Sequence, residues 1–122
     1  MNTLLFWLYL TNAVLLINHE IDSAYWKEWE LFHLPGGISG FLLMHFPLVA
    51  IVLYGLVLVA QQAFAGLIIS LVLSLVGIGA FGIHSYFIKK GHPEFRNWVS
   101  VLILILIFVI SLVQGGVTIC LF

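Results

Sequence analysis

The sequence predicts an all-α fold: a polytopic membrane protein built as a bundle of four transmembrane helices, with a short amphipathic surface helix after the first span. Composition is the first reason, because 63% of the 122 residues are hydrophobic and only 7% are charged. A water-soluble domain of this size cannot hide so much apolar surface. The apolar runs are also continuous, which argues against the alternating pattern of a β-barrel. The length leaves room for about four spans of ~20 residues each, in a single domain over residues 1–122.

Polar segments and Gly- or Pro-containing segments separate the apolar runs. The expected spans cover residues 3–17 with a continuation past His19, 38–60, 64–88 and 97–121. The connection over residues 20–36 interleaves aromatic and charged residues, a pattern typical of a helix lying at the membrane surface. Pro35 and the glycines after it turn the chain into the second span. Asn12 lies inside the first span, where a hydrogen bond between helices is as consistent with its position as a functional role.

The charged residues predict the orientation in the membrane. All four basic residues, Lys27, Lys89, Lys90 and Arg96, lie on the two connections at one end of the expected bundle. The positive-inside rule makes that end cytoplasmic, so both termini of this multi-pass cell-membrane protein are expected outside. So few basic residues form no nucleic-acid surface. The expected partners are membrane lipids, with a second copy of the chain or another membrane protein as a further possibility.

Three histidines are expected to converge in the cytoplasmic half of the bundle. His19 lies near the cytoplasmic end of the first span. His45 lies about eight residues, or roughly 12 Å, inside the second span, and His84 about four residues, or roughly 6 Å, inside the third. Ionisable groups are costly in a membrane and usually have partners or a task there. Because the three residues come from different helices, they can form one site.

Imidazole nitrogens together with a carboxylate suit zinc or ferrous iron. We therefore expect His19, His45 and His84 to bind the metal, and Glu20 and Asp22 to supply a further ligand and a catalytic base. A bound ion would lower the pKa of a water molecule, whose proton one of these acids could take.

A resemblance to a known family also indicates a metal-linked function. Residues 19–22, His-Glu-Ile-Asp, precede a tryptophan-rich connection and the segment Leu-Pro-Gly-Gly-Ile over residues 34–38. This arrangement resembles the small bacterial membrane proteins named for an HxxEE motif, and the likeness is best over residues 18–45. Here the acids follow the histidine by one and three residues, so Asp22 alone occupies a family acid position and Ser23 fills the other. The resemblance implies a metal-linked membrane enzyme.

Two functions of different classes are open at this point. The first is a metal-dependent membrane enzyme, a hydrolase being one option, that acts on a lipid or another apolar substrate. The second is a non-enzymatic membrane protein, such as a small subunit, a binder or a transporter-like component, in which the histidines and acids form a packing or proton-relay network. Haem held between His45 and His84 is a weaker third option, because their expected depths differ by roughly 6 Å. The sequence leaves the substrate, the reaction and the identity of the metal open.

Overall fold

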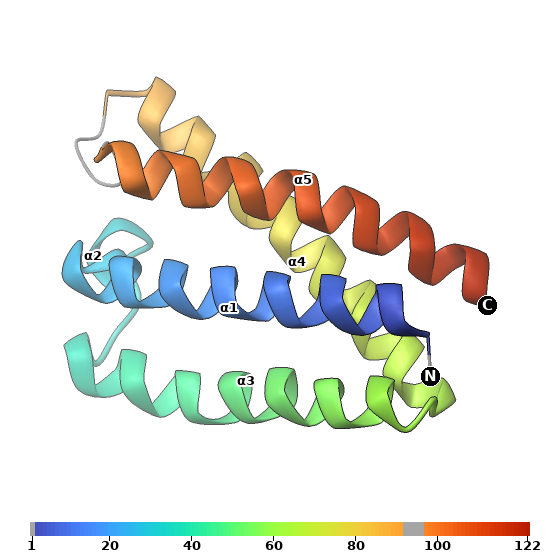
Figure 1. Cartoon of the computed structure of the whole chain (residues 1–122). Coiled ribbons are helices and arrows are strands. Elements are labelled where there is room, and N and C mark those ends of the chain that lie inside the picture. The colour runs from blue at the N-terminus through green and yellow to red at the C-terminus, as the bar shows by residue number, and fades with distance from the viewer. Residues whose placement is uncertain (1, 92–96) are drawn as a thin grey trace.

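The computed structural model describes residues 2–91 and 97–122 and confirms the predicted fold class. Four long helices form a bundle, and a short helix follows the first of them (Figure 1). The helices are α1 (Thr3–Tyr25), α2 (Glu28–Leu31), α3 (Gly37–Ala60), α4 (Phe64–Lys89) and α5 (Trp98–Leu121). All except α2 are long and apolar enough to cross a membrane. The side of the membrane on which the termini lie stays a prediction.

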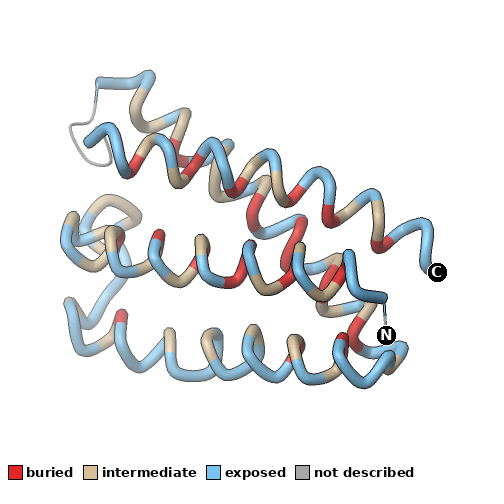
Figure 2. The backbone as a smooth tube through the Cα atoms, in the orientation of Figure 1, coloured by how far each residue is buried: buried red, intermediate tan, exposed pale blue. Residues whose placement is uncertain are grey.

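The core lies between α1, α4 and α5, and α3 is peripheral. The buried positions gather on the facing sides of these three helices, whereas α3 is mostly exposed along its length (Figure 2). Helix α3 packs against α1, α2 and α4, and among the described residues it does not contact α5. The hydroxyl of Tyr9 on α1 donates a hydrogen bond of 2.6 Å to the carbonyl oxygen of Val52, which ties α3 to the core.

A buried polar network joins α1, α4 and α5. The side-chain amide of Asn12 donates to the Gln114 side-chain oxygen at 2.9 Å and to the Ser111 hydroxyl at 3.1 Å. The Gln114 amide in turn donates to the carbonyl oxygen and the hydroxyl of Ser70, at 3.1 and 3.0 Å. Because membrane-spanning helices associate through such hydrogen bonds and through close packing, Asn12 has the helix-bonding role that the sequence left open.

Glycines set the closest helix contacts. A Cβ added to Gly77 of α4 would lie 2.0 Å from the Ser111 hydroxyl of α5. A Cβ on Gly66 would lie 2.8 Å from the backbone of Leu58, so α3 and α4 almost touch beside the turn that joins them. From there the two helices diverge toward the other end of the bundle (Figure 1).

The connection between α1 and α3 folds back against one end of the bundle. Helix α1 continues to Tyr25, and Lys27 then adopts the left-handed region with φ 53° and reverses the chain. The single turn of α2 follows and packs against α1 and α3, which confirms the short helix expected after the first span. The Trp29 ring lies 5.5 Å from that of Phe41. The polar connection that holds His92, Glu94 and Arg96 lies outside the described residues.

Candidate metal centre

His19, Glu28 and His84 form a cluster at the end of the bundle where α2 lies. Each offers one possible ligand atom, and these atoms all lie within 4.8 Å of one another. The two imidazole rings meet edge to face with their centroids 4.5 Å apart, and the residues are only 2% and 3% exposed. Glu28 Oε1 lies 4.0 Å from His84 Nε2. Two buried imidazoles and a partly buried carboxylate thus lie together at one end of an apolar bundle.

The backbone of α4 orients the His84 ring. Its Nδ1 lies 2.8 Å from the carbonyl oxygen of Ala80, and since a carbonyl oxygen can only accept, Nδ1 carries the proton. In the neutral ring Nε2 therefore carries the lone pair that a metal ion needs, and a backbone carbonyl behind a histidine is a common partner of metal-binding imidazoles. The Phe32 ring contacts the same imidazole, with 6.2 Å between the centroids.

The donor set fits zinc or ferrous iron, because two histidines and one glutamate occur in catalytic zinc sites and in facial-triad iron sites. Ligands about 2.0–2.1 Å from a tetrahedral ion lie about 3.3 Å apart, so small side-chain rotations would bring the three atoms into range. Glu28 Oε2 is buried and has no hydrogen-bond partner within the described part of the chain. A cation bound between the three residues would pair with this buried carboxylate oxygen.

A second pair lies beside this cluster. His45 Nε2 lies 2.5 Å from Glu20 Oε2, within hydrogen-bond distance. His45 Nδ1 donates to the carbonyl oxygen of Phe41 at 2.7 Å, and the two rings stack with centroids 4.0 Å apart. This pair connects α1 to α3, whereas His19, Glu28 and His84 connect α1, α2 and α4.

The structure thus brings the predicted residues together only in part. His19 and His84 lie in one cluster, and His45 pairs with Glu20. Asp22 Oδ1 accepts a 3.0 Å hydrogen bond from the Trp26 indole and lines a different cavity, which α5 also borders. The assignment of His45 as a metal ligand and of Glu20 and Asp22 as catalytic acids stays a prediction.

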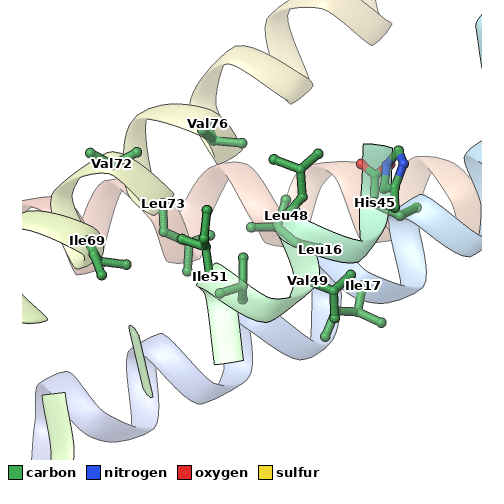
Figure 3. A pocket seen from close by; sticks show the side chains of 12 residues that line it. Leu16, Ile17, His45, Leu48, Val49, Ile51, Ile69, Val72, Leu73 and Val76 are labelled. Carbon is green, nitrogen blue, oxygen red and sulfur yellow. The ribbon is translucent and has the colours of Figure 1, made fainter. Parts of the chain in front are cut away.

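Two cavities meet at Glu20. The first, about 330 Å³ in volume, is lined by His19, Glu28 and His84 together with Glu20 and Val76. The second, about 180 Å³, lies between α1, α3 and α4 (Figure 3). Both cavities have Glu20 and Val76 as wall residues. An apolar space therefore lies directly next to the candidate metal centre.

Glu28 is the member of the cluster that sequence reasoning missed. It lies in the stretch expected to cover the membrane surface, where acids are ordinarily solvated. The left-handed conformation of Lys27 turns the chain back, so that Glu28 lies beside His19 and His84. Such a reversal cannot be predicted from helical periodicity. One available signal was its place among aromatic residues within ten positions of His19.

The family described as a family of unknown function, DUF6713, matches residues 5–120. The match covers nearly the whole chain, so the chain belongs to this family. No curated protein and no solved structure matches the chain.

Proposed function

We propose that this DUF6713 member is a metal-dependent membrane enzyme that acts on a lipid or another apolar substrate, with His19, Glu28 and His84 holding zinc or ferrous iron. One observation carries the proposal. Three possible ligand atoms from three separate helices lie within 4.8 Å of one another, and two of them belong to residues buried in an apolar bundle. In this proposal Glu28 is the third ligand beside His19 and His84, and His45 is paired with Glu20.

The cost of this arrangement supports a bound cation. Enclosing a carboxylate in an apolar environment costs several kcal/mol unless it is neutralised or paired. Among the described basic residues, Lys27 and Lys89 are exposed and Lys90 lies over the Tyr86 ring. A divalent ion would balance the Glu28 charge and use the Nε2 lone pair of His84 at the same time. The resemblance of residues 18–45 to HxxEE-type membrane proteins agrees with this function.

Hydrolysis is the reaction that this site supports with the fewest additional components. When bound by His19, Glu28 and His84, zinc would supply an activated water molecule and would polarise the bond under attack. In ester hydrolysis the oxygen of water bonds to the acyl carbon, the bond to the leaving oxygen breaks, and the leaving oxygen takes the proton. Glu20 lines the same cavity and is the carboxylate that we assign to the transfer of this proton. Water is the only co-substrate required.

Metal content tests the proposal directly. Protein purified without a metal-affinity step should contain one equivalent of zinc or iron by elemental analysis, because the site has three donors and both of its histidines are buried. His84→Ala and Glu28→Gln should reduce the metal to background. His33→Asn is the matched control, since His33 is exposed and has φ 56°, a conformation that asparagine tolerates. It should keep the metal of the parent protein.

The rival function is a non-enzymatic subunit or binder in which the cluster only packs helices or relays protons. The Asn12–Gln114 network favours it, because this chain already uses buried polar side chains to join helices. Metal-free protein that loses stability on His84→Ala and co-purifies with a second membrane protein would support this rival and overturn the metal proposal.

A further inference from the structure

The apolar cavity beside the metal cluster has one polar end. Its walls are aliphatic side chains of α1, α3 and α4, and Glu20 and His45 are the polar residues that line it. His45 lies at one end of the row of aliphatic side chains that Figure 3 shows. The cavity exists because α3 and α4 diverge away from their close contact at Gly66. It therefore follows from the geometry of the bundle.

The cavity runs from Glu20, beside the proposed metal centre, toward the middle of the membrane-spanning segments. It follows α3 from His45 to Val52 and α4 from Ile69 to Val76, in each case roughly 10 Å at 1.5 Å per residue. Val72, one of its wall residues, is 53% exposed. Side chains that line a cavity and also face outward show that it opens sideways, and in a membrane the medium at such an opening is hydrocarbon.

We propose that this cavity holds one unbranched acyl chain of a membrane lipid, which enters between α3 and α4, and that acyl lipids are the substrate class of the metal centre. The second statement rests on the proposed function. Water is a poor occupant, because a buried water molecule needs two to four polar partners and the walls offer them only at Glu20 and His45. An aliphatic cavity of about 180 Å³ that follows two helices lengthwise fits a linear chain.

The shared wall residues give the acyl chain a defined direction. Glu20 and Val76 border both cavities, so a chain in the apolar cavity places the polar group at its end beside His19, Glu28 and His84. Lipid tails are as apolar as leucine, so moving a chain from the bilayer into the cavity gains little free energy. The cavity thus orients the lipid, and the polar end supplies the affinity.

Photo-crosslinking tests the inference. The full chain is reconstituted in nanodiscs that contain a phospholipid with a diazirine in one acyl chain, and labelled residues are identified by mass spectrometry. Residues 48–52 and 69–76 should be labelled several-fold more than exposed positions on α5. Val72→Trp should abolish this excess because the indole fills the cavity. Val109→Trp is the matched control, since Val109 is a valine of similar exposure, 48%, on α5.

Metal content measured on the same samples separates this inference from the proposed function. Excess labelling that Val72→Trp removes, in protein that keeps its metal, supports both. The same labelling in metal-free protein supports the acyl-chain site and refutes the metal enzyme. Equal labelling of all exposed helix faces, or labelling that Val72→Trp leaves unchanged, overturns the inference even when the metal is present.

Discussion

Replacing Gln114 by leucine removes the centre of the polar network and gives a loss of stability that can be estimated from the structure. The side chain of Gln114 takes part in three hydrogen bonds, one from Asn12 and two to Ser70. Hydrogen bonds between membrane helices contribute about 0.6 kcal/mol each on average, so the loss should be roughly 2 kcal/mol. The groups left behind keep other partners: Asn12 still donates to Ser111, and the Ser70 carbonyl still accepts from Ser74. No large penalty for unsatisfied groups is therefore added.

The assay is reversible unfolding of the protein in bicelles by sodium dodecyl sulfate, followed by circular dichroism. Gln61→Leu is the control, since Gln61 is exposed at the end of α3, and it should change the free energy of unfolding by less than about 0.5 kcal/mol. In a double-mutant cycle, Asn12→Leu and Gln114→Leu should couple by about 0.6 kcal/mol, with 1.7 as the upper range. A coupling energy of zero would show that the two side chains do not interact and would refute the network.

Two further predictions concern packing and orientation. Gly77→Ala should destabilise the bundle by about 1–3 kcal/mol through overpacking, whereas Gly79→Ala, whose Cβ would meet nothing within 4 Å, should be neutral or stabilising, and equal effects in the same unfolding assay would argue against the tight α4–α5 contact. In a chain that carries Cys120→Ser, cysteines introduced at Asn2 and Lys90 should react with an impermeant maleimide from opposite sides of the membrane. Reaction of both from one side would disprove the predicted topology.

The sequence predicted the fold well because membrane spans are encoded locally. Continuous apolar runs determine where helices can cross a bilayer, so the bounds expected for α3, α4 and α5 agree with the structure to within one residue. The end of α1 was less predictable. The polar stretch after His19 suggests an interface, but the helix continues to Tyr25, and His19 and Ser23 are buried on it.

The candidate site was predictable only in part, because depth along a helix says nothing about rotation or tilt. Depth alone grouped His19 with His84, and the structure places these two together. The same reasoning added His45, but α3 diverges from α4 and its histidine reaches Glu20 instead. Glu28 enters the cluster through a chain reversal at a left-handed lysine. Neither tilt nor reversal leaves a periodic pattern in the sequence.

The pairing of α1 with α5 has a consequence for biosynthesis. Helix α1 is the least apolar of the four spans, with a hydropathy of 1.3 against 2.4–2.6 for the others. Its Asn12 bonds to a residue that is translated 102 positions later. At about 5–20 residues per second, the ribosome needs roughly 5–20 s to supply that partner. During this time the first helix resides in the membrane with its polar face uncovered, so a chaperone or a protease that inspects nascent membrane proteins would meet α1 before α5 can cover it.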